Sequence, residues 1–561
     1  MDEAHFKRAI FHLADLGDSD ILPPLFEFQF FKEAAEPVIK KLVSFPAGSY
    51  NPVGVFEVLS PKTQTSFRIA HQLHSTDALL FTAAAIEIAG ALDKARLTPE
   101  EGAFSYRYDD DVNSSSLFTD TCTYHDWLIA LGELCKSAEA FSNDQLILET
   151  DISDFYGRIY FHRIEHVLDD IEAANAPRKI IENVIKNSRA RQSFGLPVGG
   201  AASRIIAEGV LIDVDTMLRR EGFKFTRFVD DFRILVDSPA KAHTALCRLA
   251  EHLMLTEGLS LNAAKTRIVP ASIAKDEIDN SFSEVFTNEE RNGLDRYLRA
   301  IYDAEDVAET IADEIDVKTL LEKLEKILKL DKIEYTSVKL ILRALRVNTI
   351  DDIDGFITTF VELLYFAPRD FCILLGAQAQ KNPDIAFLIA DKILSIVQNS
   401  PFKDMALVRI WVNHLFVAGA LPITDARLTQ LEFGDTQIER RQNILLRGRV
   451  KDRAFFREAK TRFGDLSEWE KPAVMLGASC LAASEYDTWL GFCKGKSGNI
   501  LFDEYIGWLK ANRTSLLEKL NQSFVIKSRT QRLSELLSSI DISSILSNFS
   551  SLKNKKNTES S

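Results

Sequence analysis

The stretch Phe223–Val236, FKFTRFVDDFRILV, decides how the rest of the chain is interpreted. Apolar and polar residues alternate on both sides of a central acidic pair, which predicts two short strands joined by a tight turn. The pair, Asp230 and Asp231, then lies at a hairpin tip, where rigid strands hold both carboxylates exposed. This arrangement suits a metal site, although paired aspartates are also common in ordinary turns.

A second acidic position precedes this hairpin by about 80 residues. The sequence LILETDISDFYGRIY (Leu146–Tyr160) predicts an apolar strand that ends at Asp151, followed by an amphipathic helix over residues 155–171. A carboxylate at a strand end can share a two-cation site with the hairpin, because Mg²⁺ prefers a few carboxylates completed by substrate phosphates. The alternative is that Asp151 and Asp154 only cap the helix.

A turn rich in glycine lies between these two stretches. The sequence FGLPVGGAAS (Phe194–Ser203) contains Gly195 and Pro197 and leads into an apolar-periodic segment that predicts a helix. Glycine and the small residues after it let a flat group approach the backbone closely. The same composition also suits an ordinary loop before a helix.

In this order and at these spacings, the three stretches resemble the palm of reverse transcriptases. The resemblance implies that Asp151 is the first metal ligand of that family. Asp230 and Asp231 match the family's aromatic-x-Asp-Asp motif, and the three carboxylates would bind the metal and catalyse the reaction. Gly195 and Pro197 match the loop beneath the nascent base pair.

Four further positions match nucleotide contacts of the family. Lys62 and Arg68, in PKTQTSFR, correspond to the fingers residues that hold the triphosphate. Lys265, in LSLNAAKT, stands at the lysine position that protonates the pyrophosphate or contacts phosphate. Tyr156 stands where the family places an aromatic gate against the ribose 2′-hydroxyl, which implies a preference for deoxynucleotides. Apart from the resemblance, these residues are equally compatible with surface cations and a core aromatic.

The sequences DFYGRIYFHRI, GLPVGGAASRII and RFVDDF are similar to the abortive-infection branch of this family, the AbiK-like polymerases of phage defence. This resemblance implies an α+β fold, with reverse-transcriptase-like fingers and palm followed by an all-α, helical-repeat-like C-terminal domain. One departure from ordinary reverse transcriptases is Val198, which replaces a glutamine that positions the template. Its loss agrees with the untemplated synthesis of this branch.

The branch further implies a DNA polymerase that uses deoxynucleoside triphosphates with Mg²⁺, or Mn²⁺ in its place. Synthesis would start on a tyrosine hydroxyl and leave single-stranded DNA attached to a homo-oligomer, a trimer or hexamer. Tyr50, in the loop FPAGSYNPVG, is a candidate priming residue because the loop precedes the fingers and is expected to be exposed. Two alternatives stay open: an RNA-templated reverse transcriptase, and a non-catalytic nucleic-acid-binding sensor or scaffold.

The pattern divides the chain into an N-terminal helical segment (1–54), fingers and palm (55–280), a helical domain (281–545) and a disordered tail (546–561). In the helical domain, successive helix signals with almost no strand signals are typical of stacked helix pairs. Helices are expected at Glu289–Ala304, Val317–Leu330, Ser337–Leu345, Ile350–Leu364, Pro383–Gln398 and Lys403–Ala418. Earlier in the chain we expect a buried helix at Thr76–Leu92, a strand at Phe104–Val112, and a phenylalanine cluster at 26–31 in the core or at a subunit contact.

Within the helical domain, Arg440–Phe463 holds nine basic residues against two acids, with three phenylalanines interleaved. Basic charge can follow a phosphate backbone and aromatic rings can stack bases. Arg447, Arg449, Arg453 and Arg457 are therefore candidates for a nucleic-acid path or a contact with the palm. The alternative is that the phenylalanines are core residues and the charges face solvent.

The composition is that of a globular protein, with 46% hydrophobic and 27% charged residues and a net charge of −15. This charge argues against a protein that coats nucleic acid, although a local basic channel remains compatible with it. The six cysteines show no CxxC spacing, which favours a reducing cytoplasm and argues against zinc. No run of about 20 apolar residues is evident, so no membrane span is expected.

Overall fold

A four-stranded antiparallel sheet carries the predicted carboxylates. Its strand order is β4-β5-β3-β6, and the strands span Lys224–Phe228 (β4), Asp231–Val236 (β5), Leu146–Asp151 (β3) and Arg267–Pro270 (β6). Strands β4 and β5 confirm the two strands predicted on either side of the acidic pair. The computed structural model describes residues 1–519 except 64–65, 113, 142–144, 190–191, 281–315, 331–332, 334 and 432.

Helices cover both faces of this sheet. Side chains of β3 alternate between the faces, as the pleat of a strand requires. Ile147 packs against α5 (Tyr124–Phe141) and α12 (Ala271–Asn280) in a small cluster, whereas Leu148 belongs to the main core. Helix α11 (Pro239–His252) also packs against β3 and β5.

The region predicted to form the fingers contains a hairpin and a long buried helix. Strands β1 (Val55–Thr63) and β2 (Ser66–Leu73) pair antiparallel. Helix α4 (Ser75–Ala95) is buried along most of its length and packs against α1 (Glu3–Leu16), α8 (Asn175–Ser188) and α9 (Ala201–Val210). The predicted buried helix is confirmed. By length and composition α4 could cross a membrane, which the sequence analysis overlooked, but most of it lies inside the fold.

The strand predicted at Phe104–Val112 is wrong. Only isolated bridges form near it, such as Tyr108 with Phe118. The Asp109 carboxylate accepts a hydrogen bond from the Asp111 N–H at 3.0 Å. This local turn interrupts the extended backbone, because an aspartate side chain competes with sheet hydrogen bonding.

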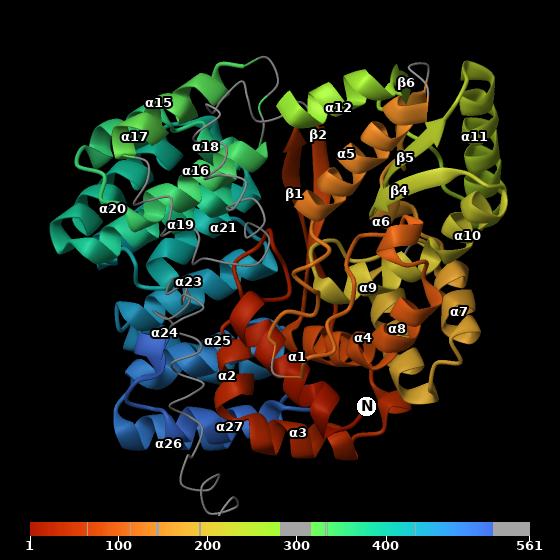
Figure 1. Ribbon diagram of the computed structural model, residues 1–561. Coiled ribbons are helices and arrows are strands. Elements are labelled where there is room, and N and C mark those ends of the chain that lie inside the picture. Colours follow the sequence, from red (N-terminus) through yellow and green to blue (C-terminus); the bar gives the residue numbers. More distant parts are fainter. Residues whose placement is uncertain are drawn as a thin grey trace, which may run out of the picture.

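We call residues 55–280 the palm half and the described residues from 316 to 519 the helical half. The N-terminal helices α1, α2 (Glu27–Glu33) and α3 (Ala35–Ser44) lie between these two halves (Figure 1). Three polar contacts join this segment to distant parts of the helical half. Trp411 Nε1 donates to the Ile21 carbonyl at 2.8 Å, and Trp508 Nε1 donates to Glu33 at 2.8 Å. Arg441 forms a buried ion pair with Glu27 at 2.8 Å. The segment is therefore a joint between the halves.

The phenylalanine cluster of this segment is part of the core. Phe28, Phe30 and Phe31 are buried within the chain. Phe30 packs against Tyr505 and Trp508, with ring centroids 5.1 and 5.7 Å apart. The core interpretation is confirmed, and these rings are unavailable for a contact between subunits.

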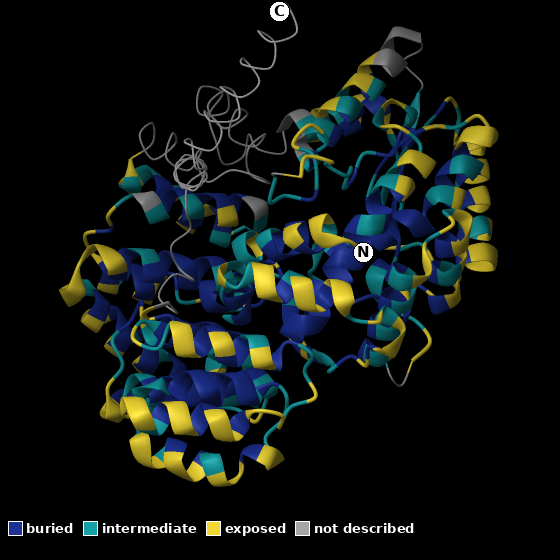
Figure 2. Cartoon of the chain, turned by 90° about the horizontal axis from the view of Figure 1, so that it is seen from below, coloured by how far each residue is buried: buried dark blue, intermediate teal, exposed yellow. Residues whose placement is uncertain are grey.

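After β6 and α12, the described residues contain helices without strands. Neighbouring helices pack against one another, as α16 does on α19 and α21 on α23. Their outward faces are exposed and their inward faces buried (Figure 2). The longer helices are α15 (Val317–Leu328), α16 (Tyr335–Val347), α17 (Ile353–Thr359), α19 (Pro368–Lys381), α20 (Pro383–Gln398), α21 (Ala406–Val417), α23 (Gln437–Arg449), α24 (Arg453–Thr461), α25 (Glu470–Gly477), α26 (Ala483–Cys493) and α27 (Phe502–Ala511).

Short helices complete this half, namely α18 (Leu363–Phe366), α22 (Asp425–Gln430) and α28 (Leu516–Lys519). The five helices predicted between 317 and 418 are confirmed, with the region 350–364 divided into α17 and α18. The helix predicted at Glu289–Ala304 and the tail 546–561 lie outside the described residues. The helical-repeat character stays a prediction.

Candidate active site

The acidic hairpin tip has a strained backbone that its surroundings hold in place. Strand β4 ends at Phe228 and β5 begins at Asp231, which leaves a two-residue turn. In that turn Val229 has a φ of 56°, a conformation that β-branched residues disfavour. Its N–H donates to Ser105 Oγ and its carbonyl accepts from Arg227 Nη1, both at 2.8 Å. Strain of this kind persists where the surrounding structure fixes it, often at functional sites.

A buried ion network lies beneath the turn. Arg227 donates to both oxygens of Asp215, at 2.8 and 2.6 Å, and reaches Glu208 at 3.1 Å. Arg96 binds the same Glu208 at 2.6 Å. All four side chains are buried, so their charges are balanced within the protein. This support was not predicted, although an arginine inside a predicted strand, between Phe225 and Phe228, was a signal for it.

The three predicted carboxylates come together at one edge of the sheet. The β3–β5 register places Asp151 opposite Asp231, and the Ile152 N–H donates to the Asp230 carbonyl at 3.1 Å. Burial, followed by the charges of Asp151 and Asp231, raises the pKa of Asp230 to about 7. Burial also raises the pKa of Asp231, against the effect of Arg233. Like charges held this close favour a bound cation.

Lys265 supplies a positive charge at this edge. Its Nζ lies 2.8 Å from Asp151 Oδ2. Burial opposes the charge of Lys265, but the bond to Asp151 and the neighbouring aspartates outweigh it and raise the lysine pKa. The Asn262 N–H donates to the Asp151 carbonyl at 2.7 Å, which fixes the loop that carries the lysine. No sequence pattern pointed to Asn262.

The donor set suits Mg²⁺. Carboxylate oxygens are its preferred protein ligands, and substrate phosphates and water complete its coordination. Among the described residues, no group of three or more His, Cys, Asp or Glu side chains is arranged to hold a metal ion. Asp151 and Asp230 are the residues that would hold it, since the mutual repulsion expressed in the pKa of Asp230 is relieved by a cation between them.

The glycine turn packs against the segment that follows Asp151. The helix predicted over residues 155–171 is interrupted, because α6 spans Phe155–Arg158 and α7 spans Phe161–Asp170. At this break the Gly195 N–H donates to the Ile159 carbonyl at 2.7 Å, and the Leu196 N–H donates to the Tyr156 carbonyl at 2.8 Å. Gly195 has a φ of 103°, and a side chain there would meet Arg189.

The bond from Leu196 brings the backbone beside Pro197 next to the half-buried Tyr156, and the nucleotide-binding roles of both residues stay predictions. Asp154 occupies the position before α6, but its side chain accepts no capping hydrogen bond. The capping interpretation of Asp154 is therefore wrong.

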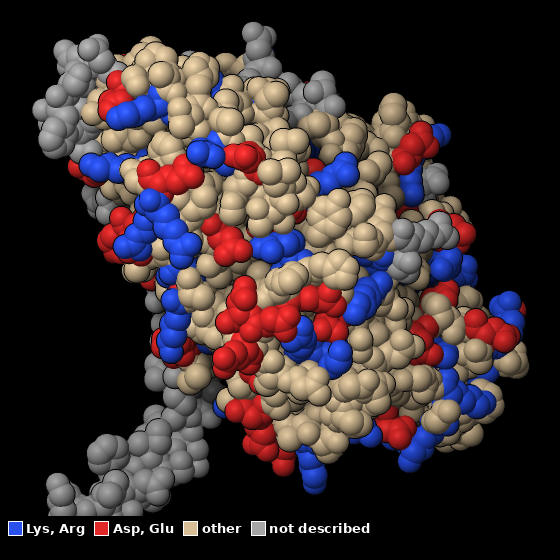
Figure 3. Space-filling view, turned by 90° about the vertical axis from the view of Figure 1, so that its right-hand side faces the viewer, with Lys and Arg blue, Asp and Glu red and all other residues tan. Residues whose placement is uncertain are grey.

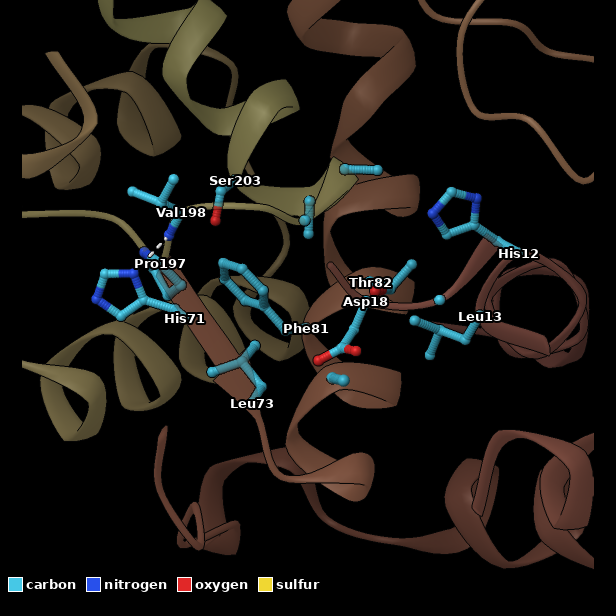
Figure 4. A pocket seen from close by; sticks show the side chains of 15 residues that line it. His12, Leu13, Asp18, His71, Leu73, Phe81, Thr82, Pro197, Val198 and Ser203 are labelled. Atoms are coloured by element: carbon cyan, nitrogen blue, oxygen red, sulfur yellow. Dashed lines mark hydrogen bonds between the residues drawn. The ribbon is translucent and has the colours of Figure 1, made fainter. Parts of the chain in front are cut away.

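The loop after Pro197 is tied to the fingers. The His71 N–H donates to the Val198 carbonyl at 3.1 Å, and the Val198 N–H donates to His71 Nδ1 at 2.9 Å. Burial lowers the pKa of His71 to about 3, so its ring is neutral and can accept this bond. Figure 4 shows the pair beside a small pocket that Asp18 and Phe81 also line. Both backbone polar groups of Val198 are therefore committed to β2.

The two predicted triphosphate ligands lie on the fingers hairpin. Lys62 is on β1 and Arg68 is on β2, and both are exposed. The ring of Phe67, next to Arg68, meets the ring of Tyr365 on α18 edge to face, with centroids 6.1 Å apart. The hairpin thus packs on the helical half, and the triphosphate-binding role of its two cations stays a prediction.

Residues 94–289 match the protein family described as reverse transcriptase (RNA-dependent DNA polymerase). The chain contains a reverse transcriptase domain. The matched range includes the three carboxylates, Tyr156 and Lys265, and it begins after the fingers hairpin. No curated protein matches the chain.

Two solved telomerase structures are remotely similar to this chain. Telomerase from Candida albicans, in complex with a fragment of telomeric RNA, is 13% identical with a TM-score of 0.29, over 68% of this chain and 70% of that chain. Apo telomerase from Candida tropicalis is 11% identical with a TM-score of 0.30, over 68% of this chain and 74% of that chain.

Tyr50 precedes the matched range of the reverse transcriptase domain and is buried. The expectation of an exposed loop side chain is wrong, since only 6% of Tyr50 is exposed. Its hydroxyl donates to the carboxylate of Asp77, which also accepts from the Gly54 N–H at 2.9 Å. A buried carboxylate needs such donors, and this requirement draws the tyrosine inward. The priming role of Tyr50 stays a prediction.

The basic segment Arg440–Phe463 lies far along the chain from the reverse transcriptase domain, and its arginines have partners within the protein. Arg447 binds Asp452 at 2.8 Å, and Arg457 binds Glu485 at 2.6 Å. Arg449 donates to the Val417 carbonyl at 2.6 Å, and Arg453 donates to the Cys480 carbonyl at 3.2 Å. A nucleic-acid path along these arginines stays a prediction, and these contacts disfavour it.

The phenylalanines of this segment follow the alternative interpretation. Phe456 and Phe463 are fully buried, and Phe455 is partly buried. The segment forms α23 and α24, and its rings face the core of the helical half. The prediction that these rings are core residues is confirmed for Phe456 and Phe463.

Proposed function

We propose that the chain is a DNA polymerase that transfers nucleotides from deoxynucleoside triphosphates to a hydroxyl, without a template and with a protein primer. The observation that carries the polymerase activity is the meeting of Asp151 with the strained Asp230 turn, where burial and like charge raise the Asp230 pKa to about 7. A reverse transcriptase domain with this carboxylate geometry is suited to two-metal chemistry.

In the reaction, the attacking oxygen forms a bond to the α-phosphorus while the bond to pyrophosphate breaks. Asp151 and Asp230 would hold Mg²⁺, which activates the hydroxyl and neutralises the leaving group. Lys265, on the same edge, is placed to donate a proton to pyrophosphate or to bind phosphate. Tyr156 would screen the sugar, and Lys62 and Arg68 would hold the triphosphate from the fingers.

Absence of a template is supported by Val198. This residue replaces the template-positioning glutamine of ordinary reverse transcriptases, and its apolar side chain offers no hydrogen bond to a template strand. Its backbone groups are both bonded to His71. A tyrosine hydroxyl would accept the first nucleotide, and Tyr50 could serve only after it leaves Asp77.

The biological role we propose is abortive infection in defence against phage, carried out in the cytoplasm by a homo-oligomer. It follows from the similarity of DFYGRIYFHRI, GLPVGGAASRII and RFVDDF to that branch. The six cysteines are free, which agrees with a reducing compartment.

The deciding experiment incubates purified protein with Mg²⁺ and labelled deoxynucleotides, without template or primer, and separates the products on a denaturing gel with and without protease. Asp230→Asn tests the site, and Asp154→Asn is the matched control because that carboxylate is exposed. Label that stays with the protein, shifts after protease and disappears only in Asp230→Asn supports the proposal. Label that requires added RNA supports a templated reverse transcriptase.

The priming residue is tested by Tyr50→Phe, with Tyr160→Phe as the control because Tyr160 is an exposed tyrosine of the palm. Loss of protein-attached label in Tyr50→Phe alone supports Tyr50 as the primer. Undiminished label shows that another hydroxyl accepts the first nucleotide. Thermal unfolding is recorded in parallel, because the substitution also removes a donor from Asp77.

A further inference from the structure

A short part of the N-terminal joint lies directly on the glycine turn. Residues 17–21, which we call the link segment, follow α1 and precede α2. The Ser19 hydroxyl accepts from the N–H groups of Ile21 and Leu22, at 3.2 and 3.3 Å, and these local bonds fix the shape of the segment. The small pocket of Figure 4, which the link segment and the glycine turn both border, has a volume of about 20 Å³. That is room for about one water molecule, so the two segments are closely packed.

Two glycines near the end of the turn make this close packing possible. A Cβ atom on Gly199 would lie 2.8 Å from Ser19 Oγ, and one on Gly200 would lie 2.9 Å from the Asp18 carbonyl oxygen. Both distances are too short for a side chain, so only glycine lets the link segment approach the backbone of the turn this closely. At these two positions the close approach that the small residues allow is therefore taken by the chain itself.

Asp20 joins the link segment to the glycine turn by two bonds. Its N–H donates to the Gly199 carbonyl at 3.4 Å, and its carboxylate accepts from Arg204 Nη2 at 2.6 Å. Arg204 lies in the first turn of α9, the helix into which the glycine turn leads. One residue thus holds both the turn and the start of α9, and the bond to Arg204 is charge-assisted.

Arg204 also contacts the aromatic residues beside the acidic hairpin. Its guanidinium carbon lies 5.2 Å from the centroid of the Tyr106 ring. The Tyr106 ring centroid lies 6.0 Å from that of Phe228, which is the last residue of β4 and pairs with Asp231. The pair of Asp20 and Arg204 therefore lies between the link segment and the hairpin that carries the carboxylates.

The other end of the link segment is fixed by the helical half. The Ile21 carbonyl accepts from Trp411 Nε1 of α21 at 2.8 Å, and both residues are buried. Asp20 directly precedes Ile21, so a bond from the helical half acts one residue away from the contacts with the turn. The position of the turn therefore depends on how the helical half is docked.

The pair of Asp20 and Arg204 is expected to contribute little to global stability. Its side chains are 51% and 26% exposed, and exposed ion pairs are weak because water and salt screen them. Acidic and basic side chains are interspersed in the same way over the face of Figure 3. This pair differs in its position, because the turn that it holds also donates the Leu196 N–H to the Tyr156 carbonyl.

We propose that Asp20 is a positioning residue for nucleotide transfer, which holds the glycine turn in place through Arg204 and Gly199. Trp411 connects this contact to the helical half, so the site is complete only when the N-terminal joint and the helical half are docked. The inference rests on the proposed function for the reaction that it affects, but the order of the turn can be measured without catalysis.

The first test compares Asp20→Ala with Asp15→Ala in the nucleotide incorporation assay. Asp15 is the matched control because its carboxylate pairs with Lys32 at 2.7 Å within the N-terminal helices. Asp20→Ala should lower kcat at least about tenfold, because a small misplacement in an active site has a large effect on rate. The KM for the deoxynucleotide should change less than about threefold, since a contact realised in the transition state affects kcat first.

Two further measurements separate positioning from general damage. The melting temperatures of Asp20→Ala and Asp15→Ala should lie within about 3 °C of the wild type, as expected for exposed ion pairs. Asp20→Glu keeps the carboxylate and should retain most of the wild-type kcat. Asp20→Ala/Arg204→Gln should be no slower than Arg204→Gln alone, because Asp20 acts through Arg204.

The connection to the helical half is tested by Trp411→Phe, with Trp508→Phe as the matched control. Each substitution removes one indole N–H bond of 2.8 Å to the N-terminal joint, but only Trp411 binds beside Asp20. Trp411→Phe should lower kcat at least about threefold, whereas Trp508→Phe should leave it unchanged.

The order of the turn is measured by hydrogen exchange of peptides from residues 194–206, in EDTA and without nucleotide. Exchange should be at least about threefold faster in Asp20→Ala and Trp411→Phe than in the wild type, because a loosened turn opens more often. Asp15→Ala and the inactive Asp230→Asn should exchange like the wild type.

Three outcomes overturn the inference. The first is wild-type kcat and exchange in Asp20→Ala, the second is an equal loss in Asp15→Ala, and the third is additive losses from Asp20→Ala and Arg204→Gln. If the wild type incorporates no nucleotide, the polymerase proposal fails, and the exchange measurement alone decides whether Asp20 holds the turn.

Discussion

The palm hairpin Phe223–Val236 and the basic segment Arg440–Phe463 are both dense in charge, but the fold treats them differently. In the hairpin, antiparallel register brings Asp231 opposite Asp151, and burial together with the charges of these two aspartates raises the pKa of Asp230 to about 7. In the basic segment, each candidate arginine has an acidic or carbonyl partner within the helical half. Charge density in a sequence therefore indicates a binding site only where the fold withholds the counter-charge.

The difference has a geometric origin. Strand pairing sets side chains from distant parts of the chain directly opposite one another, so like charges can be forced together. Stacked helices instead present each arginine to the next helix, where carboxylates and helix-end carbonyls are available. Four predictions test this contrast, in order of decreasing effect.

Asp230→Asn should reduce nucleotide incorporation by about 10³-fold, because the cation loses a charged ligand where the transition state requires it. Its melting temperature should be equal to or above that of the wild type, since one of three repelling charges is removed. Incorporation of labelled deoxynucleotide and thermal unfolding measure the two effects. A variant that remains active would remove the hairpin from the catalytic site.

Arg227→Met should lower the free energy of unfolding by about 3–5 kcal/mol, because Asp215 and Glu208 lose a buried partner. Arg219→Met is the control, since its pair with Glu101 is half exposed and should contribute no more than about 1 kcal/mol. Denaturant unfolding of both variants provides the comparison. Similar losses would show that burial does not distinguish these pairs.

The stability of the metal-free protein should depend on pH through Asp230. Its folded pKa of about 7 exceeds the ordinary aspartate value of about 4, so the folded chain binds more protons in this window. The contribution of Asp230 to the free energy of unfolding should therefore fall as pH rises from about 4 to 7. Glu485 has the opposite sign, because its bond to Arg457 lowers its pKa.

This pH effect is measured by denaturant unfolding in EDTA at both ends of the window. The wild type should lose stability relative to Asp230→Asn on going to the higher pH. A constant difference between the two proteins would mean that folding does not raise the pKa of Asp230.

Arg457→Ala should have the smallest effect. Its pair with Glu485 is exposed, so the free energy of unfolding should change by less than about 1 kcal/mol. Binding of a fluorescein-labelled (dT)20 oligonucleotide, measured by fluorescence anisotropy in EDTA, should match that of the wild type. A tenfold loss of (dT)20 affinity would instead show that the basic segment binds nucleic acid despite the internal partners of its arginines.

Much of the palm could be predicted because its signals are local. Alternation around Asp230 predicted both strands, and the strand end at Asp151 was visible in six consecutive residues. The helices between 317 and 418 followed from apolar periodicity. In each of these segments the hydrophobic pattern and the tertiary environment agree, which is the condition under which sequence patterns succeed.

The failures depend on partners that are distant in sequence. Tyr50 was expected in solvent, but Asp77 draws it inward across 27 positions. The break in the helix after Asp151 comes from backbone bonds to the turn at Gly195, which no periodicity reveals. The partners of the arginines beyond residue 440 could not be predicted, because a sequence does not show which carboxylates and carbonyls the fold places next to each arginine.

The joint formed by helices α1 to α3 also determines how late during synthesis the fold can be completed. Ile21, Glu27 and Glu33 leave the ribosome long before their partners, which lie 390, 414 and 475 positions later in the sequence. Phe30 therefore lacks the rings of Tyr505 and Trp508 until those residues have been synthesised. Such long-range contacts slow folding and leave apolar surface exposed meanwhile. A chain that stops at residue 280 would retain the three carboxylates and present this apolar surface permanently.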